Sequence, residues 1–392
     1  MEKITIGLFN DSFYPMTDGV IMVIDNYARR LCKIANVIVF VPGYLGKEYD
    51  DSKFPYEVVR CNSISFPHFD YSLPIPRIDI KFRQIVEQYK LDIVHIHSPF
   101  SMGLEGYLYA KKHHIPCIAT MHSQFKQDFE KYLTFDKSAE ILNDLLVIKL
   151  FDKCDECYAV NSEISRIFYE EYHCNEKPKV MNNATDMVPV DRKSARKEIA
   201  KLYNIKDDDK IFSFVGRLNT LKNILFIVDA LKIVKDNGFN IKMLFIGSGE
   251  DEYKLREKIK ETGLENDAIL CGKIMDRVLL AKHYAASDLF LFPSKYDASS
   301  LVQIEAASQM TPTVFINGSA TSATATDNVN AFMSEDSVDA YAAKIIEVLN
   351  NKKLYNDVAK NALNDLYKTW DQAVEDIYKI YLKNIKNYKK EV

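Results

Sequence analysis

Short apolar runs alternate with helical patterns along most of the 392 residues, and this alternation restricts the possible folds more than any other feature. The runs contain almost no polar residues, so each predicts a strand that is buried on both faces of its sheet. Helical patterns between the runs are typical of parallel strands joined by covering helices. The expected strands are Ile4–Phe9, Val37–Pro42, Ile93–His97, Cys117–Met121, Cys157–Val160, Ile211–Val215, Met243–Ile246, Ala268–Leu270, Leu289–Phe292 and Thr313–Ile316.

The length of the chain predicts two domains, because 392 residues exceed one ordinary domain. A linker with Pro and Asp, Thr185–Arg192, precedes a polar helix and marks the boundary. We therefore expect an α/β protein with two doubly wound, Rossmann-like domains, residues 1–190 and 191–368. Each domain would bind its ligand outside the carboxyl ends of its strands. A last helix is expected within residues 369–392.

Composition excludes several classes of protein. A net charge of −4 argues against general nucleic-acid binding, which favours a basic excess. No apolar run approaches the length of a membrane span, and the N-terminus lacks a signal-peptide layout, so we expect a cytoplasmic protein. The single CxxC pair, Cys154 and Cys157, has no second pair to complete a zinc site and is interpreted as buried thiols. The acidic run Asp207–Asp209 is interpreted as a solvated turn rather than a metal site.

Two carboxylates flank the start of a predicted helix in the second half. A turn after the last residues of a strand carries Asp297, the helix opens near Leu301, and Glu305 lies on its second turn. A helix start offers unpaired N–H groups and a partial positive charge, which suits a phosphate. Acids on either side of a bound diphosphate would suit the hydroxyls of two flanking sugars, so the pattern favours a nucleotide-sugar. The alternative is that Asp297 and Ser299 cap the helix and that Glu305 faces solvent.

Two cations follow another predicted strand. The strand ends at Gly216, where a missing side chain lets the backbone approach a ligand, and Arg217 and Lys222 come next. The guanidinium fork suits diphosphate oxygens, and the lysine adds a mobile point charge. Positive charge at a helix start is unfavourable for the helix itself. The pattern therefore favours a ligand-binding role over a surface role.

With these motifs in this order, the chain resembles the retaining glycosyltransferases of family 4, which have the GT-B fold. In that fold two Rossmann-like domains face a cleft, and a C-terminal helix crosses back to the N-terminal domain, here from Trp370. The most specific marker is the E/D-x7-E element from Asp297 to Glu305. The resemblance implies that Asp297 contacts the donor sugar and that Glu305 holds the ribose hydroxyls. It also implies that Arg217 and Lys222 neutralise the leaving nucleotide diphosphate, so that no metal or other cofactor is required.

Further residues take their expected roles from the same resemblance. Gly19 matches a glycine-bearing loop near the donor diphosphate, and His122 matches a histidine that reaches the donor sugar. His95 and His97 alternate on one strand but are interpreted as packing and loop-fixing residues. The expected catalytic residues are Asp297, His122, Arg217 and Lys222. The expected donor-binding residues are Gly19, Gly216, Gly249, Lys273, Ser299, Ser300, Leu301 and Glu305.

The chain also departs from the family pattern. The first acid is Asp297 where Glu is common, and Ala298 and Ser300 stand where the family usually has glycines. These departures indicate a distinct subgroup and leave the donor sugar and the turnover open.

The acceptor is predicted from three segments. Ser65–Pro76 resembles the corresponding region of bacterial diacylglycerol glucosyltransferases, while Asp79–Lys90 and Phe125–Phe135 interleave aromatic residues with Lys, which suits an anionic bilayer. We therefore expect transfer of a hexose, glucose from UDP-glucose, to a membrane lipid such as diacylglycerol, at the inner face of the cell membrane. The alternatives are a glycan acceptor of the cell envelope, or a non-catalytic GT-B partner of another transferase.

Overall fold

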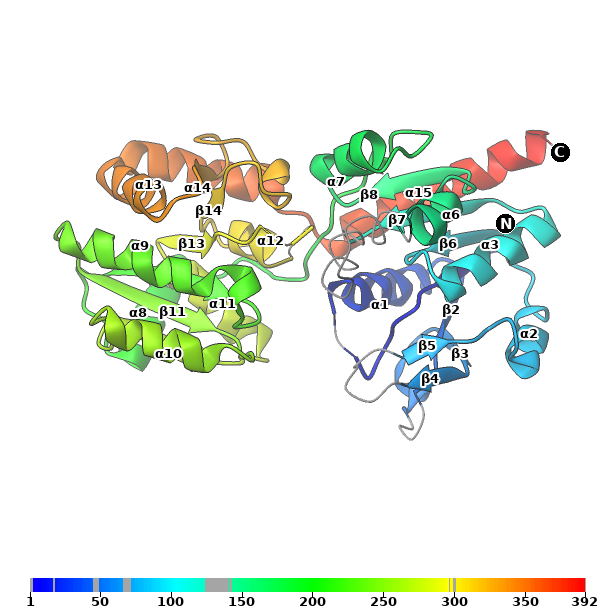
Figure 1. The fold of residues 1–392 in the computed structure, drawn as a ribbon, viewed down its shortest axis with the longest axis horizontal. Helices are drawn as coiled ribbons and strands as arrows, with labels where there is room; N and C mark the ends of the chain where they lie inside the picture. The colour runs from blue at the N-terminus through cyan, green and yellow to red at the C-terminus, as the bar shows by residue number, and fades with distance from the viewer. Residues whose placement is uncertain are drawn as a thin grey trace. The chain divides into compact units, whose positions relative to one another are not determined.

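The protein divides into two compact units (Figure 1). The structure is a computed structural model that describes residues 3–16, 18–44, 49–65, 72–123, 141, 143–295, 297–298 and 301–391. Unit 1 comprises Met1–Asn183 and Trp370–Val392, and unit 2 comprises Ala184–Thr369. The division falls a few residues before the boundary expected from the linker, and the last helix of the chain belongs to unit 1.

Unit 1 is built on a seven-stranded parallel sheet in the order β3-β2-β1-β6-β7-β8-β9. After β3 along the chain, β4 (Ser63–Ser65) and β5 (Ser72–Pro74) form a separate antiparallel pair. The strands of the sheet are β1 (Thr5–Phe9), β2 (Asn36–Pro42), β3 (Glu57–Cys61), β6 (Ile93–Ile96), β7 (Cys117–Met121), β8 (Glu156–Ala159) and β9 (Lys179–Val180). The helices are α1 (Gly19–Leu31), α2 (Ile80–Val86), α3 (Ser101–His113), α6 (Lys149–Phe151), α7 (Ser162–Arg166) and α15 (Trp370–Glu391).

Unit 2 is built on a six-stranded parallel sheet in the order β12-β11-β10-β13-β14-β15. Its strands are β10 (Lys210–Val215), β11 (Ile241–Ile246), β12 (Ala268–Gly272), β13 (Leu289–Phe292), β14 (Thr313–Ile316) and β15 (Phe332–Ser334). Its helices are α8 (Arg192–Tyr203), α9 (Ile224–Asp236), α10 (Glu252–Glu261), α11 (Arg277–Ala286), α12 (Leu301–Ser308), α13 (Val338–Asn350) and α14 (Lys352–Leu366). Short helical turns of unit 1 cover Asp51–Lys53, Asn143–Ile148 and Ile167–Glu171, and those of unit 2 cover Thr220–Lys222 and Ser322–Thr324.

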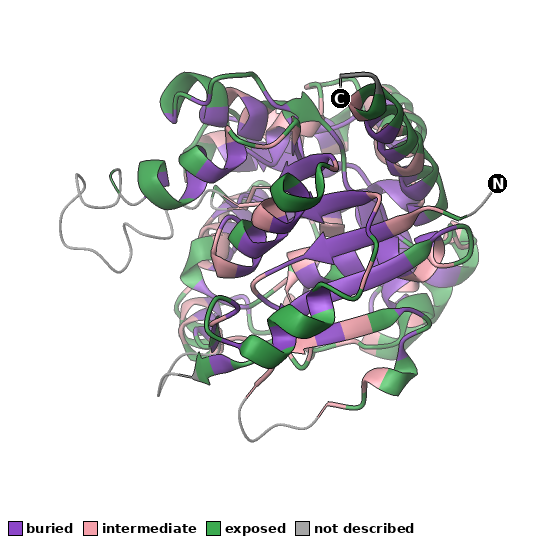
Figure 2. Ribbon diagram, turned by 90° about the vertical axis from the view of Figure 1, so that its right-hand side faces the viewer, coloured by how far each residue is buried: buried purple, intermediate pink, exposed green. Residues whose placement is uncertain are grey.

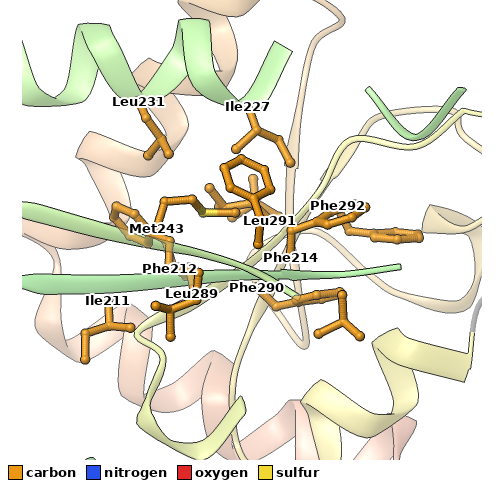
Figure 3. Packing of buried hydrophobic residues seen from close by; sticks show 14 of the residues in the cluster. Ile211, Phe212, Phe214, Ile227, Leu231, Met243, Leu289, Phe290, Leu291 and Phe292 are labelled. Carbon is orange, nitrogen blue, oxygen red and sulfur yellow. The ribbon is translucent and has the colours of Figure 1, made fainter. Parts of the chain in front are cut away.

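The strands are apolar because helices cover both faces of each sheet. Figure 2 shows the strands buried along most of their length, while the helices are buried on one side and exposed on the other. In unit 2, Phe292 stacks on Phe214 of the neighbouring strand at 6.1 Å between ring centroids, and Ile227 and Leu231 of α9 are buried in the same core (Figure 3). Burial of each such side chain contributes about 1.5–3 kcal/mol.

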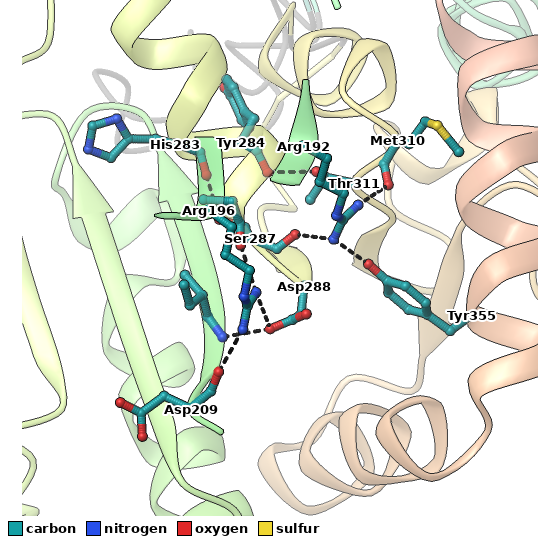
Figure 4. Close-up of polar contacts among 12 residues, drawn as sticks. Arg192, Arg196, Asp209, His283, Tyr284, Ser287, Asp288, Met310, Thr311 and Tyr355 are labelled. Atoms are coloured by element: carbon teal, nitrogen blue, oxygen red, sulfur yellow. Dashed lines mark hydrogen bonds and ion pairs between the residues drawn. The ribbon is translucent and has the colours of Figure 1, made fainter. Parts of the chain in front are cut away.

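Two arginines of α8 fix the segment that leads into β13 (Figure 4). Arg192 donates to the Ser287 carbonyl oxygen at 2.7 Å and to the Tyr355 hydroxyl at 2.6 Å. Arg196 donates to the Asp288 carboxylate at 3.0 Å. These bonds fix the start of β13, and the turn with Asp297 follows the other end of this strand.

The last helix, α15, packs within unit 1. Trp370 meets the Tyr27 ring of α1 edge-on at 5.8 Å between centroids, and Arg30 of α1 forms an ion pair with Asp371 at 2.9 Å. Further along α15, the Tyr381 hydroxyl lies 2.8 Å from His95 Nδ1 in the sheet. The helix therefore contributes buried side chains to the core of unit 1.

Several smaller features refine the sequence predictions. Cys154 and Cys157 are free, partly buried thiols, and Cys154 Sγ lies 4.0 Å from Cys117 Sγ. In the acidic run, Asp209 is buried and accepts a hydrogen bond from the Lys206 amide at 2.9 Å, so it stabilises the turn. Within the described ranges, no three His, Cys, Asp or Glu side chains gather to hold a metal ion. No described helix has both the length and the apolar character needed to cross a bilayer.

Candidate active site

The predicted acid and lysine of unit 2 meet at the point where the strand order reverses. β10 and β13 are neighbours in the sheet, but their connections run in opposite directions, and ligands bind at such switch points. Lys222, in the turn after β10, forms an ion pair with Asp297, which follows β13. Ser294 donates to the other oxygen of this carboxylate at 2.7 Å. Asn223 donates to the Pro293 carbonyl oxygen at 2.9 Å, so the two turns are tied together by side chains and backbone.

Glu305 on α12 is only 6% exposed, so the alternative of a solvent-facing side chain is wrong. Its Oε1 accepts a hydrogen bond from Arg277 at 2.7 Å, and its Oε2 accepts one from the Tyr284 hydroxyl at 3.1 Å. Burial raises the pKa of the Glu305 carboxyl, while the Arg277 guanidinium works in the opposite direction. Sequence reasoning missed Arg277, because its position at the start of α11 carries no signal for a partner on α12.

The other expected residues of unit 2 follow the carboxyl ends of neighbouring strands. Arg217 comes after β10 and is exposed, and none of the described residues forms a hydrogen bond or ion pair with its guanidinium. Lys273 is exposed directly after β12, and Leu301 is the first residue of α12. Ser299 and Ser300 lie outside the described residues.

The expected donor-binding glycines differ in what surrounds them. A Cβ at Gly249 would lie 2.3 Å from the Leu218 carbonyl oxygen, so close backbone packing explains this glycine. A Cβ at Gly216 would meet only the Phe214 ring, at 3.2 Å. A Cβ at Gly19 would meet nothing within 4 Å. Of these three expected glycines, Gly249 is the one that the packing of its own unit requires.

This contrast gives a paired test of the glycines. We expect Gly249→Ala to lower the free energy of unfolding of unit 2 by about 1–3 kcal/mol, because the new methyl group overlaps backbone atoms. We expect Gly19→Ala to keep the stability of the wild type and to lose about tenfold or more in transferase activity, because the methyl group displaces substrate from the helix start. Thermal unfolding by circular dichroism and initial rates measure both effects. Full activity in Gly19→Ala would remove this glycine from the site.

In unit 1 the loop after β1 is anchored at the corresponding switch point, between β1 and β6. Asp11 accepts hydrogen bonds from Ser98 Oγ at 2.6 Å and from the Met102 amide at 2.9 Å, which ties this loop to the start of α3. Asp18 caps α1 by accepting from the Ile21 amide at 2.8 Å. Gly19 follows as the first, exposed residue of α1, so unpaired N–H groups of that helix lie at the carboxyl edge of the sheet.

His122 follows β7 directly at the same edge and is half-buried. Its Nε2 lies 3.0 Å from Nδ1 of His97, which follows the neighbouring strand β6. Burial lowers the pKa of His122 to about 3, so the imidazole is neutral near pH 7. His95 lies deeper, between the hydroxyls of Tyr381 and Thr120 at 2.8 and 2.7 Å, as a packing role requires.

The structure thus gathers the expected residues in two places. Lys222 and Asp297 are in contact in unit 2, where Arg217 follows the same strand as the lysine. Gly19 and His122 belong to the carboxyl edge of the sheet in unit 1.

Two family models match the chain one after the other. The model described as Glycosyltransferase Family 4 matches residues 17–188, and the one described as Glycosyl transferases group 1 matches residues 195–365. Similar curated proteins include the alpha-monoglucosyldiacylglycerol synthase of Streptococcus pneumoniae, which is 25% identical over 79% of this chain and 70% of that protein. The synthase of the same name from Acholeplasma laidlawii is 24% identical over 91% of each chain. A UDP-Gal:alpha-D-GlcNAc-diphosphoundecaprenol alpha-1,3-galactosyltransferase from Escherichia coli is 26% identical over 90% of this chain and 89% of that protein.

Solved structures share the fold over almost the full length. Sucrose-phosphate synthase from Thermosynechococcus elongatus has a TM-score of 0.77 at 16% identity, covering 97% of this chain and 99% of that one. Anabaena HepE in complex with UDP-glucose has a TM-score of 0.73 at 15% identity, covering 96% and 100%. The chain has two α/β domains with parallel sheets and a C-terminal helix, and it shares its fold with these solved structures. The predicted GT-B fold is therefore confirmed. Since the two family models together cover most of the chain, this protein belongs to the family 4 glycosyltransferases of GT-B fold.

Proposed function

We propose that this glycosyltransferase moves glucose from UDP-glucose to a hydroxyl group of a membrane lipid such as diacylglycerol, with retention of anomeric configuration. The observation that carries the donor side of the proposal is the contact between Lys222 and Asp297 at the switch point of unit 2. A cation there suits the leaving diphosphate, and an acid beside it suits the hydroxyls of the transferred sugar. Both side chains are already held in place by the turns that carry them.

The comparisons support the choice of substrates. Two of the similar proteins are named as synthases of a glucosylated diacylglycerol, and HepE was solved with UDP-glucose. The E. coli relative is named for a lipid-linked acceptor with a sugar already attached. A lipid-linked glycan is therefore the second candidate acceptor.

In the proposed reaction, charge builds on the leaving diphosphate as the bond from its oxygen to the anomeric carbon breaks. Arg217, Lys222 and the N–H groups at the start of α12, including that of Leu301, stabilise this charge. Asp297 and His122 orient the sugar. The acceptor oxygen bonds to the anomeric carbon from the face of the leaving group, and its proton passes to a phosphate oxygen. The cations neutralise the diphosphate in this scheme, which therefore calls for no metal ion.

In this proposal, the Glu305 carboxylate can accept further hydrogen bonds from the ribose hydroxyls. Each of its oxygens accepts one hydrogen bond, from Arg277 or Tyr284, and a carboxylate oxygen can accept two. Burial raises the pKa of the Glu305 carboxyl, and the Arg277 contact works against this shift in favour of the charged form. A charged acceptor forms the stronger hydrogen bonds to hydroxyl groups.

An apolar ledge in unit 1 supports contact with a membrane. Ile64 and Leu73 face each other across β4 and β5 and are 44% and 48% exposed, while Ile78 and Ile80 before and within α2 are 71% and 69% exposed. The Asn62 amide donates to Asp79 at 2.8 Å, so β4 and the start of α2 are adjacent. Exposed basic side chains accompany the ledge, namely Arg77, Lys81 and Arg83. Apolar side chains among basic ones suit an anionic bilayer surface. The segments 66–71 and Phe125–Phe135, predicted to share this role, lie outside the described residues.

The ledge gives a direct binding test. We expect the double substitution Ile78→Ser and Ile80→Ser to weaken binding to phosphatidylglycerol-containing vesicles by about tenfold or more, because each isoleucine contributes about 1.5–3 kcal/mol when fully buried. Co-sedimentation measures the partition, and Val188→Ser, at another exposed apolar position, serves as the control in unit 2. Equal partition of both variants, or no binding by the wild type, would contradict the proposed membrane surface.

The proposed function is tested by release of nucleotide diphosphate from UDP-glucose, UDP-galactose, UDP-N-acetylglucosamine and GDP-mannose, each with and without diacylglycerol in mixed micelles. We expect release from UDP-glucose that diacylglycerol stimulates. Stimulation with another donor would keep the acceptor and correct the sugar. Release that only a glycosylated diphosphoundecaprenol stimulates would favour the second candidate acceptor.

A further inference from the structure

A pair of neutral histidines lies at the carboxyl edge of the sheet in unit 1. His97 Nδ1 and His122 Nε2 are 3.0 Å apart, which is a hydrogen-bond distance, and one of the two nitrogens must carry the proton. Burial lowers the pKa of His122 to about 3 and that of His97 well below its usual value. Each ring therefore carries a single proton near pH 7, and its position decides which nitrogen can donate.

The second nitrogen of His97 determines the direction of this bond. His97 is 1% exposed, and its Nε2 is buried without a hydrogen-bond partner among the described residues. If His122 donated, the proton of His97 would reside on Nε2 as a buried, unpaired N–H group. If His97 donates, Nε2 keeps only an unpaired lone pair. Buried unpaired donors are the rarer of the two in folded proteins, so His97 Nδ1–H donates to His122 Nε2.

Neighbouring rings keep His97 in this orientation. The His95 ring lies 4.0 Å from the His97 ring between centroids, and the Tyr27 ring meets His97 edge-on at 6.3 Å. His95 is itself fixed, because its two nitrogens contact the hydroxyls of Tyr381 and Thr120. Contacts with both of these rings therefore hold the His97 ring before any substrate binds.

We infer that His97 is a positioning residue that holds His122 as the tautomer with its proton on Nδ1. His122 Nε2 accepts the bond from His97, so the only proton of the His122 ring remains on Nδ1. No described residue forms a hydrogen bond with His122 Nδ1, and the side chain is half-buried at the edge of the sheet, so this N–H group is available to a substrate oxygen. The inference rests on the proposed function, in which His122 orients the donor sugar as a neutral hydrogen-bond donor.

Two substitutions of matched chemistry separate positioning from packing. The amide nitrogen of an Asn side chain can take the place of the imidazole Nδ1–H, so we expect His97→Asn to keep kcat within about threefold of the wild type. His97→Leu fills similar space without a donor, and we expect it to lower kcat by about tenfold or more with little change in KM for the donor. Equal kcat in wild type and His97→Leu would overturn the positioning role.

The tautomer is measured without activity. Nitrogen-15 NMR of the substrate-free protein, with the His122 signals assigned by their loss in His122→Asn, should show Nδ1 as protonated and Nε2 as the acceptor nitrogen. A protonated Nε2 on His122 would overturn the inference even if His97→Leu fails to fold. Failure of the proposed function gives a different result: no sugar transfer from any donor, or full activity in His122→Asn, while the NMR spectrum still reports the tautomer.

Discussion

Arg217→Ala is expected to lower kcat/KM for sugar transfer by about 100- to 1,000-fold, or about 3–4 kcal/mol of transition-state stabilisation. The reason is that its guanidinium follows β10 at the switch point of unit 2, beside the turn that carries Lys222. No described residue pairs with this guanidinium in the substrate-free protein. The substitution therefore removes no internal contact, and we expect the melting temperature to stay within about 1 °C of the wild type.

Arg256→Ala is the matched control for this prediction. Arg256 is an exposed arginine of the same unit, and it forms an ion pair with Glu252 one turn away on α10 at 2.7 Å. Exposed pairs of this kind contribute little to stability, so the control should match the wild type in both rate and melting temperature. Activity of Arg217→Ala within about threefold of the wild type, which is less than about 1 kcal/mol, would remove Arg217 from the transition state.

Three histidines are expected to cost unit 1 about 6 kcal/mol of its free energy of unfolding between pH 7 and pH 5. Burial lowers the pKa values of His95 and His122 to about 3, and that of His97 well below the ordinary value of about 6.5. As the pH falls through 6.5, the unfolded chain takes up protons that the folded unit cannot accept, so the folded state is destabilised. Each histidine contributes about 2 kcal/mol over this range, a large share of the stability of an ordinary domain.

A single fluorophore reports on this unit. Trp370 is the only tryptophan of the sequence, and it is buried against Tyr27 in unit 1. Urea titrations followed by its fluorescence at pH 7 and pH 5 give the two free energies. The raised pKa of the Asp11 carboxyl acts in the opposite direction, because its folded form binds a proton more readily. The glutamine of His95→Gln cannot titrate, so this variant should recover about a third of the loss. An equal pH dependence in the variant and the wild type would contradict the explanation.

The fold could be predicted because its signals are local. Buried parallel strands such as β1, β10 and β13 are apolar runs, and each was predicted within two residues of its bounds. β3 and β9 were not predicted, because Glu57 and Arg60 leave no continuous apolar run in Glu57–Cys61, and Lys179–Val180 is too short to form a pattern. Their pairing depends on the strands beside them rather than on their own sequence.

The candidate site could be predicted only in part. The positions of Asp297 and Lys222 followed from motifs at strand ends, and the structure brings the two side chains together. The contacts of Glu305 with Arg277 and of His122 with His97 join residues far apart in the sequence, and no spacing rule connects them. Gly249 shows the reverse case: its motif indicated a ligand, while the structure adds close contact with Leu218 as a reason for the glycine.

Glucosyl transfer to diacylglycerol can be followed with radiolabelled UDP-glucose in mixed micelles, as label that enters a chloroform-soluble product, for the wild type and for Asp297→Asn. This substitution keeps the size of the side chain and removes the charge that pairs with Lys222. We expect the wild type to form an α-linked glucosyl diacylglycerol, with the anomeric configuration retained, and the variant to be at least about 100-fold slower. Three results would contradict the proposed retaining transfer to diacylglycerol: a labelled lipid formed equally fast by the variant, a β-linked product, or no labelled lipid at all.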